Sequence, residues 1–325
     1  MDLSIVAALY HSEPYLENFY RRVRAAAEAI TADFEIILVN DGSPDRTLEI
    51  ALSLFRQDER VRVIDLSRNF GQHRAMMTGL AHARGNLVFL IDSDLEEDPE
   101  LLAQFRDRLK ETGADVVYGV QTRRKGGLWE RISGAIFYKL FIALSSAPIP
   151  RNLTTVRLMT RRYVQALVQH KDREIFLAGL WHITGFEQIS FPVSKASKGS
   201  SSYTFRRKVT VAVNAMTSFS SAPLVFIFYL GVFILIVSWL AALYLVIQKL
   251  FFGTFLFGWP SLIVSIWMIG GLTIFSIGII GIYLSKIFIE TKDRPYTVIR
   301  EIYQNESQGG PLDAQRIRRE RSSIL

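Results

Sequence analysis

The amino-acid sequence predicts an α/β domain with a parallel-rich sheet, followed by two membrane-spanning helices. Two observations lead to this prediction. Short β-rich runs alternate with helical patterns over the first 120 residues, an order that favours a parallel sheet with helices on both faces. Two long stretches near the C-terminus contain no charged residue. A chain of 325 residues has room for one domain of about 100–200 residues and for this additional segment.

The alternating elements can be placed along the chain. The expected strands are residues 3–10, 34–40, 61–66, 87–92 and 115–120. The expected helices between them are residues 13–30, 47–56, 73–83 and 99–111. Ligands of such sheets bind beyond the carboxyl ends of the strands. The polar turns that follow Asn40 and Ile91 are therefore the expected location of a functional site.

The two charge-free stretches are each long enough to cross a bilayer. No Asp, Glu, Lys or Arg occurs between Lys208 and Lys249, or between Lys249 and Lys286. Because a spanning helix needs about 20 apolar residues, we expect one span at residues 223–247 and another at residues 261–285. A buried core helix is the alternative for a single stretch of this kind, and two stretches in tandem disfavour it.

Basic residues gather at the outer ends of the two spans, and Lys249 is the only charge between them. The positive-inside rule therefore places both termini and the α/β domain in the cytoplasm. Small residues four apart in the spans would permit helix contact, so a homo-oligomer is left open. The basic residues at the outer ends are Arg206, Arg207, Lys208, Lys286, Lys292 and Arg294.

Charge is distributed unevenly along the rest of the chain. Residues 1–120 contain 13 Lys and Arg against 21 Asp and Glu, whereas residues 121–173 contain 11 against 2. A basic segment of this kind indicates binding to a membrane surface or to a phosphate-bearing substrate. Nucleic acid is not an expected partner, because no nucleic-acid motif accompanies the charge. The absence of cysteine excludes disulfides and thiolate chemistry.

An amphipathic pattern lies within this basic segment, at residues 128–145. Apolar residues recur there at helical spacing, and Glu130, Arg131 and Lys139 interrupt the pattern. We expect an amphipathic helix that lies in the membrane interface. A helix packed on the core of the domain is the alternative.

The most informative motif is Asp92-Ser93-Asp94, which directly follows an apolar run. Two carboxylates separated by one residue at a strand end can share one divalent cation, and hard oxygen ligands suit Mg²⁺ or Mn²⁺. The acidic run after the motif is also explained by a solvated helix N-terminus. That explanation does not extend to Asp92, so the motif predicts a metal site.

A second polar turn, with the sequence NDGSPD, occupies residues 40–45 and follows another predicted strand. Asp41 is the first carboxylate beyond that strand, so we expect it to bind a ligand such as a base or ribose. Asp45 precedes a predicted helix, and a helix cap explains it without any ligand.

These turns belong to a longer series of motifs. The series is Tyr10 with Glu13, NDGSPDRT at residues 40–47, LSRNFGQHRAMMTGLAHARGN at residues 66–86 and IDSDLEEDPE at residues 91–100. In this order the motifs resemble the family 2 glycosyltransferases. The resemblance is closest to the polyprenyl-phosphate branch, which contains dolichyl-phosphate mannose synthases and bactoprenol glucosyltransferases. Two C-terminal spans match the bactoprenol type.

The resemblance implies a Rossmann-like, nucleotide-sugar-binding domain of the GT-A type. It implies that Asp41 contacts the nucleobase and that Asp92 lies near the ribose and the sugar. It also implies that Asp94 binds Mg²⁺ or Mn²⁺ with help from Glu96, where the family commonly has Gln. The expected nucleotide-sugar-binding residues are Ala8, Tyr10, Glu13, Asp41, Asp92 and Ser93.

The same resemblance gives the basic segment a role in binding the lipid phosphate. Arg124 and Arg131 match arginines near the acceptor site of the family, and arginines grip phosphate through paired donors. The resemblance therefore implies that Arg131 is catalytic together with Asp92 and Asp94. The expected lipid-phosphate-binding residues are Arg124, Arg131, Arg157, Lys198 and Ser200.

One departure from the family pattern affects the chemistry. The family's Gly-Asp-Phe-Arg-Leu-Met reads TTVRLM at residues 154–159, so Thr155 stands in place of the usual acid while Arg157 is kept. A phosphate monoester has a second pKa of about 6 and reaches a site at neutral pH mostly as a dianion. We therefore expect transfer to proceed without an obligatory general base.

The resemblance predicts inverting transfer of a sugar, with glucose from UDP-glucose favoured, to a polyprenyl phosphate at the cytoplasmic membrane face. GDP-mannose or another UDP-sugar is the alternative donor, and a non-catalytic membrane scaffold is the non-enzyme alternative. A processive polysaccharide synthase is disfavoured, because the sequence lacks a Gln-x-x-Arg-Trp motif. The expected domains are residues 1–127 for the nucleotide sugar, 128–221 for the acceptor and juxtamembrane helices, 222–289 for the spans and 290–325 for a basic cytoplasmic tail.

Overall fold

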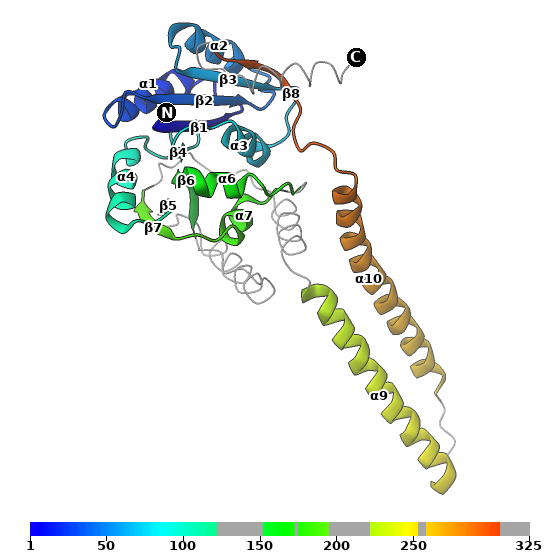
Figure 1. Ribbon diagram of the computed structural model, residues 1–325. Helices are drawn as coiled ribbons and strands as arrows, with labels where there is room; N and C mark the ends of the chain where they lie inside the picture. Colours follow the sequence, from blue (N-terminus) through cyan, green and yellow to red (C-terminus); the bar gives the residue numbers. More distant parts are fainter. Residues whose placement is uncertain (122–151, 173–174, 195–221, 253–257, 306–325) are drawn as a thin grey trace. The chain divides into compact units, whose positions relative to one another are not determined.

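The computed structural model describes residues 1–121, 152–172, 175–194, 222–252 and 258–305. The chain divides into two compact units. The first consists of residues 1–126, 149–202 and 295–325, and the second of residues 127–148 and 203–294. The described part of the first unit contains the sheet, and that of the second contains two long helices (Figure 1).

The first unit is built on an eight-stranded sheet in the order β7-β5-β6-β4-β1-β2-β3-β8. Its central strands are parallel: β1 pairs with β2 and β4, and β2 pairs with β3. Strand β6 runs antiparallel to both β4 and β5, and β8 runs antiparallel to β3. The strands are β1 Leu3–Leu9, β2 Phe34–Asn40, β3 Val61–Leu66, β4 Leu87–Leu90, β5 Val116–Gln121, β6 Leu153–Thr160, β7 Gln188–Val193 and β8 Ile299–Tyr303.

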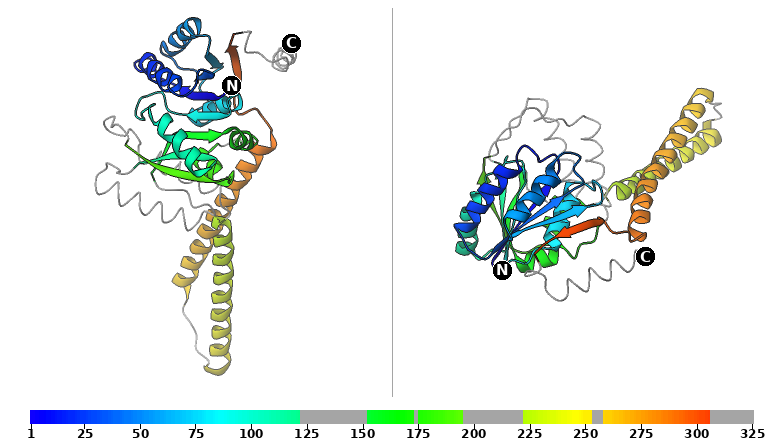
Figure 2. Two further views of the ribbon diagram at one scale, coloured as in Figure 1. Left: turned by 60° about the vertical axis from the view of Figure 1, so that its left-hand side comes forward. Right: turned by 90° about the horizontal axis from the view of Figure 1, so that it is seen from above.

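Helices cover both faces of this sheet (Figure 2). On one face α1 contacts α2 and α4, and on the other face α3 contacts α6. Helix α1 shows why the sequence folds this way, because its buried residues Leu16, Phe19, Val23 and Ala27 recur every three or four positions. The helices of this unit are α1 Leu16–Glu28, α2 Thr47–Gln57, α3 Gln72–Ala81, α4 Leu101–Thr112, α6 Arg161–Leu167 and α7 Leu177–Ile183.

The core follows the alternation of the central strands. The odd-numbered side chains of β1 lie in one hydrophobic cluster with α1, α2 and α4. Val6 points to the opposite face, where α3 packs so closely that a Cβ at Gly79 would lie 2.5 Å from a Val6 methyl carbon. Burial on both faces explains why these strands are largely apolar.

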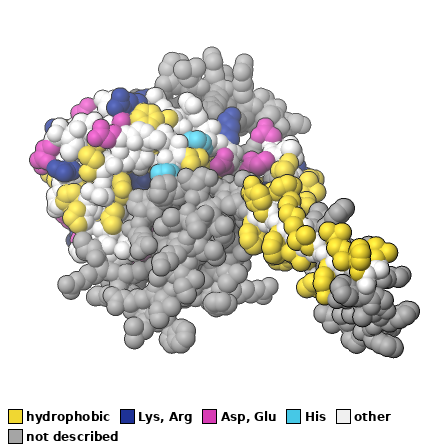
Figure 3. All heavy atoms as spheres, turned by 90° about the horizontal axis from the view of Figure 1, so that it is seen from below, with side chains coloured by type: hydrophobic (Ala, Val, Ile, Leu, Met, Phe, Trp, Pro, Cys, Tyr) yellow, Lys and Arg dark blue, Asp and Glu magenta, His cyan; other side chains and the backbone are white. Residues whose placement is uncertain are grey.

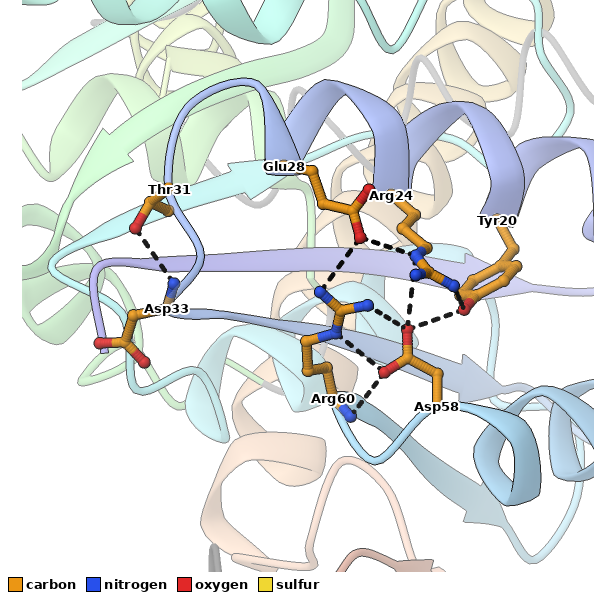
Figure 4. A network of polar contacts seen from close by, with 7 residues as sticks. All are labelled: Tyr20, Arg24, Glu28, Thr31, Asp33, Asp58 and Arg60. Atoms are coloured by element: carbon orange, nitrogen blue, oxygen red, sulfur yellow. Dashed lines mark hydrogen bonds and ion pairs between the residues drawn. The ribbon is translucent and has the colours of Figure 1, made fainter.

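A polar network lies at the amino end of β3, at the edge of the sheet opposite the polar turns (Figure 4). Tyr20 donates to Asp58 at 2.7 Å, and Arg60 bridges Asp58 and Glu28 at 2.9 and 3.2 Å. Burial opposes the ionisation of Asp58, but the hydrogen bonds from Arg60 and Tyr20 outweigh it and lower its pKa. The network thus ties α1 to the start of β3.

The second unit contains α9 (Ala222–Phe252) and α10 (Trp259–Thr291), which contact each other. Their described side chains are largely hydrophobic and exposed, as Figure 3 shows along these helices. Among the described residues, one stretch, Ser265–Thr291, is long and apolar enough to cross a membrane, whereas the apolar stretch described in α9 is the shorter Leu224–Ile234. The predicted span at residues 261–285 therefore has a matching helix, and the predicted span at residues 223–247 is not confirmed.

The five predicted strands and four predicted helices of the first 120 residues are all present, with ends shifted by at most a few residues. The domain bounds stay a prediction, and within the expected tail from residue 290 the structure adds a strand, because residues 299–303 form β8 in the sheet. The predicted amphipathic helix at residues 128–145 lies outside the described residues.

Candidate active site

The carboxyl ends of β2, β1 and β4, which are neighbours in the sheet, bring their polar turns together (Figure 1). Ser12, in the turn after β1, has its Oγ 2.9 Å from the Oγ of Ser93, and its N–H donates to Oγ1 of Thr47 at 3.0 Å. Ser93 also donates to the carbonyl of Ala8 at 3.2 Å. Because Ser12 and Ser93 are buried, these bonds satisfy groups that water cannot reach and fix the two turns together.

The turn after β1 is held from its other side by the turn after β2. The Oγ of Ser43 accepts the His11 N–H at 2.8 Å and donates to Asp45 at 2.6 Å. Glu13 accepts the N–H of Arg46 at 3.1 Å, at the start of α2. Burial opposes the ionisation of Asp45, but its hydrogen bonds, led by the one from Ser43, lower its pKa to about 2. Asp45 therefore has the expected structural role in the turn, although the N-cap residue of α2 is Arg46.

Asp41 holds the loop that precedes α3. One of its carboxylate oxygens accepts the N–H of Phe70 at 2.7 Å, and the other accepts the N–H of Gly71 at 2.9 Å. Burial raises the pKa of Asp41, and the two backbone donors act in the opposite direction. Gly42, at a φ of 60°, packs against the same loop so closely that a Cβ would lie 2.4 Å from the carbonyl carbon of Arg68. The turn after β2 and loop 68–71 are thus in direct contact.

The turn after β4 is oriented by contacts on two sides. Gln72, the first residue of α3, donates to Asp92 at 2.7 Å. Asp94 accepts the N–H of Glu96 at 3.1 Å across Leu95, which has a φ of 60°. A left-handed backbone is costly for a bulky residue, and such strain gathers at functional sites. The strained turn and its contacts hold the carboxylates at the strand end.

The carboxylates of this turn have the right chemistry for Mg²⁺ or Mn²⁺ but do not complete a site. Among the residues that the structure describes, no group of three or more His, Cys, Asp or Glu side chains could hold a metal ion. Asp94 and Glu96 supply hard oxygen donors, and Mg²⁺ usually takes its other ligands from waters and substrate phosphates. The donor set therefore fits a cation that binds together with a diphosphate.

A buried carboxylate stands beside Thr155, the position without the family's usual acid. Glu97 is 1% exposed, and its Oε1 accepts the N–H of Thr155 at 3.1 Å. Arg157 is also 1% exposed, and its guanidinium lies 2.9 Å from the ring centroid of Trp181. Burial lowers the pKa of Arg157 to about 9, and the charge of Glu97 acts in the opposite direction. Glu97 and Arg157 therefore lie in the interior, beneath the turn that carries Asp94.

The structure brings all of the predicted nucleotide-sugar and metal residues to this edge of the sheet. Tyr10 is 47% exposed there, with its ring centroid 4.5 Å from that of His11. Of the predicted lipid-phosphate residues Arg157 is buried in the interior, and the others lie outside the described residues. The residues at the edge are Ala8, Tyr10, Glu13, Asp41, Asp92, Ser93, Asp94 and Glu96; those outside the description are Arg124, Arg131, Lys198 and Ser200.

Three residues of this edge were not among the predictions: Ser12, Gln72 and Glu97. Gln72 follows Gly71 directly inside a quoted motif, so its place at a helix start beside another strand end could have been recognised. Nothing in a single sequence distinguishes the buried Glu97 from the exposed Asp98 that follows it.

Comparison with known proteins identifies the family. The model for "Glycosyl transferase family 2" matches residues 4–168, which include all but the first residue of β1, strands β2 to β6, helices α1 to α4 and helix α6. The chain is a member of glycosyl transferase family 2. The predicted family is confirmed, and the α/β fold with a mostly parallel sheet agrees with it.

Relatives of this family 2 glycosyltransferase match nearly the whole chain. A protein of Mycobacterium tuberculosis grouped with the glycosyltransferases is 60% identical over 94% of this chain and 90% of the relative. The bactoprenol glucosyl transferase of Shigella phage SfII is 32% identical over 94% of this chain and 99% of its own. The uncharacterized glycosyltransferase YkcC of Bacillus subtilis is 32% identical over 95% of this chain and 96% of its own.

Proposed function

We propose that this glycosyltransferase transfers a sugar from a nucleotide donor to a polyprenyl phosphate, with glucose from UDP-glucose favoured. The observation that carries the proposal is the match of the bactoprenol glucosyl transferase of phage SfII to 94% of the chain, including the helices beyond the family domain. GDP-mannose or another UDP-sugar is the alternative donor. A membrane scaffold would need neither the carboxylates at the end of β4 nor the ordered turn beside them.

For the donor, we propose that the edge formed by the three turns binds the nucleotide and the sugar. Asp41 and loop 68–71 would shape the pocket for the base, because that carboxylate fixes the loop through two backbone N–H groups. Asp92, which Gln72 orients, would lie near the ribose and the sugar. Asp94 and Glu96 would hold Mg²⁺ or Mn²⁺, which when bound neutralises charge on the leaving diphosphate.

In the proposed reaction, an oxygen of the lipid phosphate attacks the anomeric carbon of the sugar. The bond from that carbon to the donor diphosphate breaks, and the nucleoside diphosphate leaves with the electron pair, so the configuration inverts. The acceptor is already mostly a dianion at neutral pH, so no side chain has to remove a proton. This agrees with Thr155 in place of an acid.

For the acceptor, we propose that the basic residues around the site hold the lipid phosphate through charge-assisted hydrogen bonds. Arg157 would act indirectly from the interior of the domain. Its guanidinium donates to the carbonyls of Thr154 and Thr155 at 3.3 and 3.2 Å and so holds this part of β6 in place. The proposed direct contacts are Arg124, Arg131, Lys198 and Ser200.

We propose that α9 and α10 form a two-span hairpin and that the first unit, which carries the sheet and is called the catalytic unit below, lies on the cytoplasmic side. Strand β8 follows α10 and pairs with β3, and therefore belongs to the unit from which the chain departs before α9. A chain that leaves one folded unit and returns to it crosses a bilayer an even number of times. This argument supports two spans, or none, over a single span.

A donor and acceptor screen tests the function. Purified protein is offered UDP- and GDP-sugars with polyprenyl phosphate, and we expect transfer from UDP-glucose in particular.

Asp94→Asn should lower turnover by two orders of magnitude or more, because a neutral amide is a poor ligand for a hard cation. Asp98→Asn is the matched control, since that exposed carboxylate of the same turn pairs with Arg22 at 2.8 Å. Transfer that persists unchanged in excess EDTA would contradict the metal, and the absence of transfer from every donor would favour the scaffold.

A further inference from the structure

Strand β8 reaches the catalytic sheet from beyond the membrane helices and outside the segment that the family model matches. It pairs antiparallel with β3, with Asp65 opposite Glu301 and Leu66 opposite Ile299. The register shifts between these pairs, so Arg300 is an extra residue in β8. A bulge of this kind bends the strand and turns the extra side chain in a new direction.

The bulge directs Arg300 toward the end of β3. Its two terminal nitrogens donate to the carboxylate of Asp65 at 3.0 Å and to the carbonyl of Ser67 at 2.8 Å. Asp65 is 1% exposed, and its second oxygen accepts from the side-chain amide of Asn40 at 2.7 Å. A buried carboxylate is stable only with charged and hydrogen-bonding partners, and Arg300 supplies the charge.

These contacts continue to the donor edge, which is the edge of the sheet formed by the turns after β1, β2 and β4. Asn40 is the last residue of β2, and its side-chain oxygen accepts the N–H of Ser43, which lies two residues beyond Asp41. On the other side, Ser67 donates its N–H to the carbonyl of Val298 at 2.9 Å. Strand β8 and its bulge therefore support both the turn after β2 and the start of loop 68–71. Asp41 connects the same turn and loop through the N–H groups of Phe70 and Gly71.

The segment before β8 also contacts α3. The hydroxyls of Thr297 and Thr78 lie 2.8 Å apart. Helix α3 begins at Gln72, which orients Asp92. The C-terminal segment thus contacts α3 and residue 67, at the start of loop 68–71, directly, and it reaches the turn after β2 through Asp65 and Asn40.

We propose that β8 maintains the geometry of the donor site and that Arg300 is a positioning residue for the nucleotide. Arg300 acts through Asp65 and Asn40 to keep the turn after β2 in its binding geometry. Residues 292–298 alone separate α10 from β8, so the donor site is completed by chain that follows the membrane hairpin. The inference rests on the proposed function, because it assumes that this edge binds a nucleoside diphosphate.

The experiment measures binding of UDP and GDP to the full-length protein in detergent by calorimetry, together with the KM of the lipid acceptor. We expect Arg300→Ala to weaken binding of the preferred nucleotide at least tenfold while the acceptor KM stays within twofold. Arg300→Lys should recover part of the affinity, since it keeps the charge but not the forked contact. Glu301→Ala, at the next and exposed position of β8, should bind as the wild type does.

Each outcome bears on one claim. If Arg300→Ala is folded and binds the nucleotide like the wild type, or if donor and acceptor affinities fall equally, the positioning role is overturned and the proposed function stands. If the wild type binds neither nucleotide, the proposed function fails and this inference fails with it. If Arg300→Ala does not fold, Arg300→Gln takes its place, because the shorter amide keeps one donor toward Asp65. Adding Asp65→Asn to the weakened variant should restore binding in part, as the unpaired buried charge is then removed.

Discussion

Two charged residues, Glu97 and Arg157, lie in the interior of the fold close to the carboxylates of the candidate active site. Each is 1% exposed. The pKa of Arg157 is lowered to about 9 by burial, so the guanidinium is still protonated at neutral pH. A buried cation needs a negative partner, and Glu97 interacts with it electrostatically from the turn after β4. Glu97 thus joins Thr155 and Arg157 to the turn after β4, through a hydrogen bond to the first and its charge on the second.

We expect Glu97→Gln to lower the free energy of unfolding by about 3 kcal/mol, because it leaves the charge of Arg157 buried without its carboxylate. Combining it with Arg157→Met should recover much of that loss, since neither charge then remains. Chemical unfolding in detergent at pH 7 measures both. Glu100→Gln is the control, as that exposed carboxylate pairs with Arg22 at the surface and should change stability by less than about 0.5 kcal/mol. An unchanged stability for Glu97→Gln would show that Arg157 is balanced by other groups.

Loops rather than helices position the proposed donor site, and close backbone contact is what holds them. The turn after β2 and loop 68–71 meet where Gly42 allows an approach that no side chain would permit. Asp41 then closes the contact through the N–H groups of Phe70 and Gly71. The pocket for the nucleotide base is therefore expected to depend on this packing as well as on individual polar contacts.

We expect Gly42→Ala to abolish nucleotide binding within the measurable range, because the new methyl group would collide with the backbone of Arg68. Gly113→Ala is a matched control: its φ of 71° imposes a similar backbone cost of about 1 kcal/mol, but nothing lies within 4 Å of the added carbon. Calorimetric titration with UDP on both variants separates steric displacement from backbone strain. Equal affinities in the two variants would mean that loop 68–71 does not shape the pocket.

At the scale of the whole molecule, the return of the chain from α10 to the sheet constrains the membrane topology. The described residues include one stretch that is long and apolar enough to span, while β8 lies in the same sheet as the N-terminal strands. In the proposed topology, both ends of the helical hairpin therefore lie on one side of the bilayer. The basic residues Lys286, Lys292 and Arg294 favour the cytoplasmic side for the C-terminal end of α10.

We expect a reporter inserted at Gly253, between the two helices and outside the described residues, to be accessible only from the side opposite the catalytic unit. A reporter at the C-terminus should share the side of the N-terminus. Accessibility of cysteines introduced at these positions to an impermeant reagent provides the measurement, and the cysteine-free sequence supplies a clean background. Labelling of position 253 from the cytoplasmic side would refute the hairpin.

Local patterns were sufficient to predict the central α/β architecture and the strand ends at which the candidate site lies. The alternation of β-rich and helical runs predicted the first five strands and the helices between them, because each of those runs carries its own periodicity. Asp41, Asp92 and Asp94 were found because polar groups directly after apolar strands meet at one edge of a parallel sheet. The motif order also predicted the family, which the comparison confirmed.

The sequence by itself therefore determined the class of fold, the edge of the sheet that carries the carboxylates and the family. Only the tertiary structure decided which partners these groups have. It placed Glu97 in the interior beside Thr155, turned Arg157 away from the surface and brought Arg300 to the end of β3. The physical reason is that these hydrogen bonds join residues 58 and 235 positions apart, or that the placement depends on burial, and no local period records either.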